Sequence, residues 1–597
     1  MSKIVKIGGA CGFYGDSSVA PTQLMKAGVD YLILDYLAEA TMSVLGSMRQ
    51  HRANLGYAFD FTEWVWKDNL ALIKQTGTKI VTNAGGVNPH ACAERMRKIA
   101  ADAGMEFRIA VITGDEMLDR MDDYAKAGTK ELFTGQDFPP VDKINTANAY
   151  LGGTPIARAL AMGADMVITG RVVDSALTLG ILMHEHGWTA QQYDQLSAGS
   201  LAGHVIECGA QATGGLFTDW QDVPDWAHIG YPIIECHSDG SFIVTKPEGT
   251  GGLVTTAVVA EQILYEVGDP QAYMLPDVVC DFTRLQLSQI GDNRVKVDGA
   301  VGYPPTGSYK LSITWKDGDR IQAFMPIVGR DAAGKAQKQC EAIVTRLEDM
   351  LREKNIGPFR AKRIEIIGAE SSYGAQARAQ ETREVVAKLA VEHDDPTAFK
   401  FFLREFDSPT TSMAVGTTGW FGSRAEVKPV MRVYSTLIAR GEVPITIDLD
   451  GKTETMTVTS GATYDPAKRL PVDAVPAAAA EGETRSVPLI DIAWARSGDK
   501  GDAFNIGVIA RRPEYLPYIR AALTPERMMQ WFAHEFEDAK DPAVLRYDVP
   551  GLNAINLHFL NSLGGGQFAS LRLDPLAKAK AQQLLDIEIS IPASLAA

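Results

Sequence analysis

The sequence has few cysteines and no long hydrophobic run. Six cysteines are scattered over 597 residues without paired spacing, which argues for reduced thiols rather than a disulfide framework. No apolar stretch approaches the ~18 residues that are needed to span a bilayer. The first residues also lack the basic and apolar regions of a signal peptide. We therefore expect a cytoplasmic protein that makes no contact with a membrane.

Clustered positive charge is absent as well. The formal net charge is -16 and no run of lysine or arginine interrupts it, so the chain lacks the footprint that binding to a phosphate backbone requires. We expect no nucleic acid partner. The GxGxxG spacing of dinucleotide sites, the Walker lysine and the four-ligand sets of structural zinc are also missing. The sequence thus gives no strong signal for NAD or a metal, and the cofactor stays unknown, with Mg²⁺ on scattered carboxylates left open.

The chain does contain a repeated pattern of strand and helix over its first 175 residues. Short apolar runs end in Gly-rich or polar loops, and amphipathic segments separate them. The clearest helix is expected over residues 89–103, with Asn88 as its N-cap and Gly104 as its stop. This repetition predicts an α/β fold with a mostly parallel sheet. The predicted strands are Lys3–Gly8, Tyr31–Asp35, Lys79–Asn83, Phe107–Ile112, Glu131–Thr134 and Met166–Thr169.

The character of the chain changes twice after this repeat. From about residue 193 to 330, strands separated by turns predict an inserted β-rich region, with hairpin signals at Asp239-Gly240 and Asp317-Gly318. A Pro- and Ala-rich segment without hydrophobic periodicity then indicates a linker. A mixture of strands and helices at the end predicts a small α+β domain. We expect a large α/β domain, the linker and the small domain at residues 1–464, 465–488 and 489–597.

Carboxylates near strand ends are the candidate catalytic groups. Ligands of open parallel sheets bind outside the carboxyl ends of the strands, and carboxylates crowded there shift one another's pKa values. Asp35 and Glu39 follow the second predicted strand, Asp174 lies in TGRVVDSA, and Glu207 lies in GHVIECGAQATGG. We interpret these four as candidate acid and base groups. Solvated carboxylates, and an ion pair of Asp174 with Arg171, are the alternatives.

Two glycine-rich loops are candidates for binding an anion. The loop at residues 8–17 follows a strand, and PEGTGG at residues 247–252 precedes an apolar helix, so backbone amides could gather at a helix N-terminus. Simple turn formation and helix capping are the alternatives. Basic side chains nearby would supply counter-charge. The candidate binding residues are Gly9, Asp16, Asn83, Gly85, Gly86, Arg171, Lys246, Thr250 and Gly251.

The segment ARSGDKGDAFNIG has an unusual density of charge. It carries Arg496, Asp499, Lys500, Asp502 and Asn505 within ten residues, and we place them in a loop that follows a strand. Such a loop could bind substrate or dock on the large domain. A solvated turn with internal ion pairs is the alternative.

Several long motifs together resemble the acyclic terpene utilisation (AtuA) family. They are GGACGFYGDS, TNAGGVNP, GADMVITGRVVDSALTLG, GHVIECGAQATGG and KPEGTGGLVTTAVVAEQILYEVGDP. ARSGDKGDAFNIG and LNSLGGGQ resemble the small ferredoxin-like C-terminal domain of that family. The resemblance implies bacterial catabolism of acyclic terpenoids such as citronellol or geraniol through branched acyl-CoA intermediates. It implies no particular reaction and no catalytic residues.

Two hypotheses of function follow from these observations. In the first, the protein is a hydratase- or lyase-like enzyme that acts by proton transfer on an acidic branched-chain small molecule, with CoA as one possible part of the substrate. In the second, it is a non-catalytic binding or assembly subunit whose C-terminal domain docks a partner enzyme of the same pathway. Sheet edges that need covering also predict a homo-oligomer.

Overall fold

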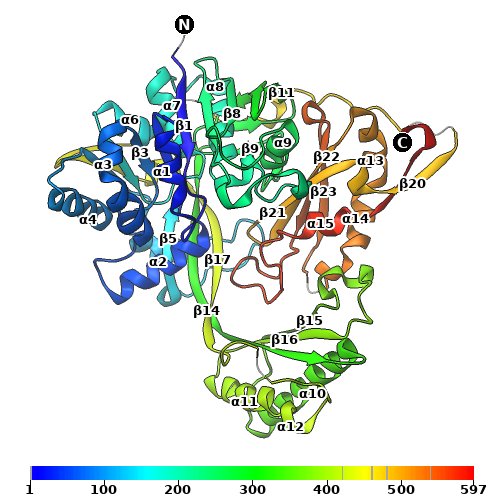
Figure 1. The fold of residues 1–597 in the computed structure, drawn as a ribbon. Coiled ribbons are helices and arrows are strands. Elements are labelled where there is room, and N and C mark those ends of the chain that lie inside the picture. Colours follow the sequence, from blue (N-terminus) through cyan, green and yellow to red (C-terminus); the bar gives the residue numbers. More distant parts are fainter. Residues whose placement is uncertain (1–2, 420, 459–461, 479–481, 538, 597) are drawn as a thin grey trace.

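The structure is a computed structural model that describes residues 3–419, 421–458, 462–478, 482–537 and 539–596 (Figure 1). A large body built on an eleven-stranded sheet contains the N-terminus, an arm extends from it, and a smaller C-terminal body packs beside it (Figure 1). Within the described ranges, no helix is long and apolar enough to cross a membrane.

Five neighbouring parallel strands form the middle of the eleven-stranded sheet. Their apolar runs, such as YLIL and MVIT, are buried throughout, as expected for strands covered on both faces. They confirm five of the six predicted strands. In spatial order they are β1 (Val5–Gly9), β2 (Tyr31–Leu34), β3 (Lys79–Thr82), β6 (Met166–Thr169) and β4 (Ile109–Thr113).

Antiparallel strands extend this sheet at both ends, so it is mixed rather than mostly parallel. Next to β1 lie β7 (Ile233–Cys236), β8 (Phe242–Thr245), β12 (Arg294–Asp298) and β11 (Gln286–Gly291). Next to β4 lie β18 (Ile445–Leu449) and β19 (Lys452–Met456). The predicted hairpin at Asp239-Gly240 is confirmed, because this pair joins β7 to β8 and Gly240 has φ 95°.

Helices cover both faces of the sheet and enclose two separate cores. One core contains α1 (Val19–Lys26), α2 (Glu39–His51), α3 (Lys67–Thr76) and α4 (Pro89–Asp102). The other contains α6 (Thr154–Ala161), α7 (Ala176–His186), α8 (Tyr193–Ile206) and α9 (Thr256–Leu264). Helix α4 begins as predicted, since the Asn88 side chain accepts a hydrogen bond from the Ala91 amide at 3.4 Å. The short α5 (Met121–Lys126) follows β4 along the chain.

Two local predictions are wrong within this large body. Residues 131–134 form a turn instead of a strand, because the Glu131 carboxylate accepts hydrogen bonds from the amides of Phe133 and Thr134 at 2.7 and 2.6 Å. The expected β-rich region begins instead with helix α8. Its glycines reflect close packing, since a Cβ at Gly203 would lie 2.7 Å from the Ser175 carbonyl oxygen.

The arm is built on a second antiparallel sheet that shares one long strand with the large body (Figure 1). The first part of β14 (Ser308–Val328) pairs with β5 (Ile144–Ala149), and its second part pairs with β16 (Glu384–His393). Gly318, expected in a hairpin, instead has φ 78° at a bulge inside β14. The arm also contains β15 (Ala361–Ile367), α10 (Ala332–Glu353), α11 (Pro396–Asp407) and α12 (Pro409–Ser412). Strand β17 (Val427–Ala439) pairs with residues 308–321 of β14 and so runs mostly along the part of β14 that lies in the large body.

The C-terminal body is a four-stranded antiparallel sheet with helices on one face. The sheet order is β21 (Ala493–Lys500), β22 (Ala503–Ala510), β24 (Ala554–Leu560) and β23 (Ala543–Val549). Its core includes side chains of α13 (Leu516–Ala522), α14 (Pro525–Trp531) and α15 (Lys580–Leu584). The opposite face of the sheet packs on α9 of the large body.

Smaller strands complete the architecture. In the segment expected as a linker, the last residues form β20 (Thr484–Pro488), which pairs with β25 (Glu588–Pro592). Residues 479–481 of that segment lie outside the described residues. A three-stranded sheet near α8 and α9 consists of β9 (Tyr273–Met274), β10 (Val279–Asp281) and β13 (Val301–Tyr303).

Candidate functional site

Three of the predicted catalytic carboxyl groups lie together. Asp35 follows β2, Asp174 lies between β6 and α7, and Glu207 follows α8. One carboxyl oxygen from each residue lies within 4.8 Å of the others. At such a spacing the groups share protons or a cation, because like charges so close together disfavour full ionisation. We call these three residues the carboxyl cluster.

Asp35 is buried and is held by Asn83. The Asn83 side chain donates a hydrogen bond to Asp35 Oδ1 at 2.6 Å, and its own oxygen accepts one from the Tyr36 amide at 2.8 Å. Burial raises the pKa of Asp35 well above its usual value, and the nearby Asp174 raises it further. Both polar ends of Asn83 are therefore occupied, and Asn83 positions Asp35 instead of offering a free amide to an anion.

Glu207 is oriented by a histidine that was not among the predicted site residues. His204 lies one turn earlier on α8, and its Nδ1 is 3.1 Å from Glu207 Oε1, while its Nε2 is 3.2 Å from the Ile263 carbonyl oxygen. Burial raises the pKa of Glu207 to about 6, despite the opposing effect of His204. A carboxyl group that titrates near neutral pH can both accept and donate a proton. The spacing of three residues on a helix was the signal for this pair.

Glu39 lies beside the cluster in a cationic environment. It accepts hydrogen bonds from Tyr150 Oη at 2.6 Å and from Lys310 Nζ at 3.3 Å. Burial would raise the pKa of Glu39, but the charges of Lys310 and Arg171 outweigh it and hold this pKa well below its usual value. Glu39 therefore stays ionised, and an acid/base role suits it less well than it suits Asp35 or Glu207.

Arg171 links these two groups of side chains. Its Nη1 lies 3.0 Å from Asp174 Oδ1 and its Nη2 lies 3.0 Å from Tyr150 Oη, while the ring of Tyr150 lies 4.2 Å from the guanidinium carbon. The ion pair considered from the sequence is therefore present. Arg171 is only 3% exposed. It therefore acts as a buried counter-charge for Asp174, and little of the Arg171 surface is available to a ligand.

The charged segment of the C-terminal body reaches the same region. Residues 496–505 lie in the hairpin of β21 and β22, not in a loop after a strand. Lys500 Nζ lies 2.8 Å from Glu266 Oε2, and Lys578 Nζ lies 3.1 Å from Glu266 Oε1 and 3.4 Å from Asp499 Oδ1. The partners on the large body show that this segment docks on it, and the solvated-turn alternative is wrong for Lys500 and Asn505.

The predicted anion loop at residues 8–17 uses its polar groups internally. The Gly9 amide donates to the Pro232 carbonyl at 3.0 Å, and Asp16 accepts hydrogen bonds from the amides of Gly12 and Ser17 at 2.9 and 2.6 Å. A Cβ at Gly9 would lie 2.1 Å from the Ile206 carbonyl oxygen. Gly9 therefore permits close packing on α8, and Asp16 stabilises its own loop.

Gly85 and Gly86 also serve the packing of their loop. A Cβ at Gly85 would lie 2.4 Å from the Thr169 carbonyl oxygen. Gly86 has φ 55° and its amide donates to the Asn83 carbonyl at 3.1 Å. These contacts are those of a tight turn, which was the alternative to anion binding.

The PEGTGG loop does not open helix α9, so its amides do not lie at the helix N-terminus as expected. Thr255 is the N-cap of α9, and its side chain accepts a hydrogen bond from the Val258 amide at 3.3 Å. The Gly251 amide already donates to the His228 carbonyl at 2.8 Å. Lys246 Nζ donates to the Thr250 carbonyl at 2.6 Å. The loop is thus a self-contained turn whose lysine is bound to its own backbone.

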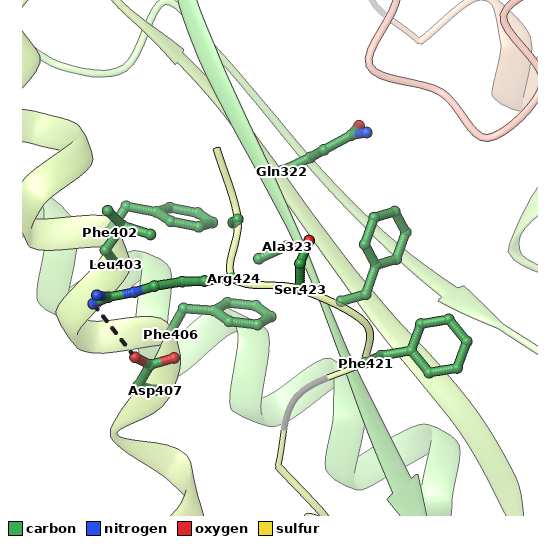
Figure 2. A pocket seen from close by; sticks show the side chains of 11 residues that line it. Gln322, Ala323, Phe402, Leu403, Phe406, Asp407, Phe421, Ser423 and Arg424 are labelled. Atoms are coloured by element: carbon green, nitrogen blue, oxygen red, sulfur yellow. Dashed lines mark ion pairs between the residues drawn. The ribbon is translucent and has the colours of Figure 1, made fainter. Parts of the chain in front are cut away.

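Two recesses elsewhere on the described chain are poorly suited to a small organic anion. One has a volume of about 40 Å³ and lies in the arm, where Phe402, Phe406 and Phe421 surround it (Figure 2). Sites for small organic ligands usually measure roughly 300 to 1,000 Å³. The other has a volume of about 300 Å³, but three carboxylates (Asp194, Asp239 and Asp298) and a single lysine, Lys296, line it, and this excess of negative charge would repel an anion. Neither recess includes the carboxyl cluster.

Comparison with known proteins identifies both bodies. The family model described as "Acyclic terpene utilisation family protein AtuA" matches residues 5–449. The model described as "AtuA ferredoxin-like domain" matches residues 487–590. No curated protein and no solved structure matches the chain.

Proposed function

The chain belongs to the acyclic terpene utilisation family, and on that premise we propose that it is a catabolic enzyme that acts on an acidic, branched acyclic terpenoid by proton transfer. The free acid and its acyl-CoA ester are the two forms of substrate to consider. The carboxyl cluster would perform a reaction of the hydratase or lyase type. The observation that carries this proposal is the close grouping of Asp35, Asp174 and Glu207, two of which have raised pKa values.

The three carboxyl groups have environments that suit different tasks. In the dehydration direction Glu207, with a pKa of about 6 after burial, would take the proton from the carbon next to the carbonyl of a β-hydroxy acid or thioester. Asp35, with a pKa raised by burial, would protonate the β-hydroxyl group, which leaves as water as the double bond forms. The reverse reaction adds water to the double bond and a proton to the carbon next to the carbonyl. Asp174 would hold Arg171 in place through their 3.0 Å ion pair. Groups whose surroundings set different protonation states are typical of acid/base catalysis.

This region is partly open to solvent. The side chains of Asp174 and Lys310 retain 26% and 32% of their accessible surface, and Glu39 retains 15%. Cations beside the cluster would favour an anionic ligand. The substrate would therefore meet the proton-transfer groups on one side and positive charge on the other.

Exchange of substrate hydrogen in heavy water tests the proposal whatever the product is. Geranoyl-CoA and geranic acid are incubated with the full chain in D₂O, and deuterium in the recovered substrate or product is measured by mass spectrometry. We expect incorporation with the unaltered protein and a loss of about 10²- to 10⁴-fold in Glu207→Gln, the range for removal of a general acid or base.

The matched control is Glu94→Gln on the exposed side of α4, which should exchange at the normal rate. Absence of exchange and of any product with both compounds would refute the enzymatic proposal. Equal exchange in Glu207→Gln and the unaltered protein would refute the role of the cluster.

The assembly-subunit hypothesis has less support. The sheet face through which the C-terminal body could have bound a partner enzyme is covered by α9 of the same chain, with Asn505 bonded to the Leu264 carbonyl at 2.7 Å. Removal of the C-terminal body would uncover this face. Deletion would therefore disturb the large body in either case, and single substitutions separate the hypotheses better.

A further inference from the structure

We infer that the C-terminal body completes the site and that Lys500 binds the anionic group of the substrate. The inference rests on the proposed function. It adds a role for Lys500, a role for the C-terminal body, and the chemical class of the group that is bound. The recognised group is an anionic oxygen group, either the carboxylate of a free terpenoid acid or a phosphate of its CoA ester.

The alternation of β21 directs one set of its side chains at the large body. Trp494 Nε1 donates to Asp219 Oδ2 at 2.7 Å, and the guanidinium carbon of Arg496 lies 5.1 Å from the Tyr265 ring. Ser497 lies on the other face, where its hydroxyl donates to the Ala577 carbonyl at 2.6 Å. Lys500 continues the first set at the end of the strand, which brings its ammonium group to Glu266.

The hairpin that carries Lys500 is held rigidly against the large body. A Cβ at Gly498 would lie 2.5 Å from Glu266 Cγ, and a Cβ at Gly507 would lie 2.5 Å from Leu264 Cβ. Asn505 donates to the Leu264 carbonyl at 2.7 Å. Glycine at both contact points lets the strands approach α9 closely. The position of Lys500 relative to the carboxyl cluster is therefore set by packed backbone.

Lys500 is the cation of this region with the most surface available. Its side chain is 49% exposed, compared with 32% for Lys310 and 35% for Lys578. Its ammonium group has three donors, and the hydrogen bond to Glu266 uses one of them. Lys578 also contacts Glu266, so this carboxylate keeps a counter-charge when Lys500 bonds to a ligand.

The charge of Lys500 also acts on the groups of the proposed reaction. It lowers the pKa values of Glu39 and Glu207 and itself has a raised pKa; partial loss of hydration opposes that rise, but Glu266 and Asp174 outweigh it. Contacts along one segment also join the two: His204, which lies 3.1 Å from Glu207, contacts the Ile263 carbonyl oxygen, and Glu266, the partner of Lys500, lies three residues after Ile263. On this basis Lys500 and Glu207 would belong to one site.

Binding measurements on full-length variants test the inference. Isothermal titration calorimetry compares geranic acid, geranoyl-CoA and geraniol, which share a carbon skeleton but differ in charge. For Lys500→Met we expect an affinity loss of about ten- to a hundredfold for an anionic ligand and no change for geraniol. Lys500→Arg should recover part of the affinity. A loss for geranic acid identifies the carboxylate as the bound group, and a loss confined to geranoyl-CoA identifies a phosphate.

Lys362→Met is the matched control, since Lys362 is 53% exposed and pairs with Glu348 at 2.6 Å in the arm. It should bind all three compounds normally. Unchanged binding of both anionic ligands to Lys500→Met, or equal losses for geranic acid and geraniol, would overturn the inference. Lack of anion binding by the unaltered protein would overturn it too.

The failure of this inference can be separated from that of the proposed function. Normal deuterium exchange together with binding that is independent of Lys500 refutes the inference alone. Anion binding that depends on Lys500 without any exchange refutes proton-transfer catalysis and retains Lys500 as part of a binding site. Near-normal melting temperatures of the Lys500 variants would show that the body remains docked.

Discussion

Replacement of Glu261 by glutamine should stabilise the protein at pH 8 and change its stability much less at pH 5. Glu261 lies on α9 beneath the C-terminal sheet and is 0% exposed. Its Oε1 accepts a hydrogen bond from the Thr218 amide at 3.3 Å, whereas its Oε2 has no hydrogen-bond partner among the described residues. Burial raises the pKa of Glu261 from 4.5 to about 7, although Arg496 opposes the change.

The sign and size of the effect follow from proton linkage. The folded protein binds the proton of the Glu261 carboxyl group more tightly than the unfolded chain does. The stability that this protonation contributes is therefore fully present below pH 4.5 and is lost as the pH rises through about 7. A rise from 4.5 to about 7 corresponds to about 3 kcal/mol at pH 8. Glutamine has the shape of the protonated glutamate and does not ionise. Glu261→Gln should therefore recover up to about 3 kcal/mol at pH 8, and below about 1 kcal/mol at pH 5.

Thermal unfolding at the two pH values measures this difference. Since the entropy of unfolding is about 2.1 cal/mol/K per residue, a gain of about 3 kcal/mol corresponds to a rise in melting temperature of roughly 2–3 °C if the chain unfolds as one unit. Glu94→Gln is the control and should change the melting temperature at neither pH. Lower stability of Glu261→Gln at pH 8 would refute the reasoning and show that Arg496 requires the charge. An equal gain at both pH values would show that titration of Glu261 is not the cause.

Four further predictions concern domain docking, the reaction and assembly. Gly507→Val should loosen the C-terminal body and speed its proteolysis, because a Cβ already lies 2.5 Å from Leu264 Cβ. Arg511→Met should lower the free energy of unfolding by about 1 kcal/mol, since it removes two contacts of 2.6 and 2.7 Å with Asp219, and urea titration would detect it. Glu207→Gln should remove the change in the deuterium exchange rate with pH near pH 6, which titration of Glu207 would cause. Solution scattering should give the mass of an oligomer, and a monomeric mass would contradict that prediction.

The central strands could be predicted from the sequence because their signal is local. YLIL and MVIT are short, apolar on nearly every position and bounded by polar or glycine residues, which is the pattern of a strand buried on both faces. The same logic placed Asp35 and Asn83 at the ends of neighbouring strands. Their meeting at one edge follows from the parallel arrangement.

The features that escaped prediction depend on contacts between distant segments. Nothing near residues 144–149 indicates that they pair with β14, more than 150 residues later. The turn at Glu131 depends on one carboxylate that accepts two amide hydrogen bonds. Lys500 was expected in a loop, because its partner, Glu266, lies far away in the sequence. Periodicity carries no information on such pairings.

The docking of the C-terminal body on α9 has a consequence for the synthesis of the protein on the ribosome. Synthesis proceeds from the N-terminus, and domains generally fold in that order, so the five central parallel strands, which end at Thr169 and include the strand before Asp35, can form long before Lys500 and Lys578 have been made. During that interval the α9 surface around Leu264 and Tyr265, buried in the finished protein, is exposed to the cell. The nascent chain therefore presents an apolar surface to which chaperones can bind until nearly the whole chain has emerged.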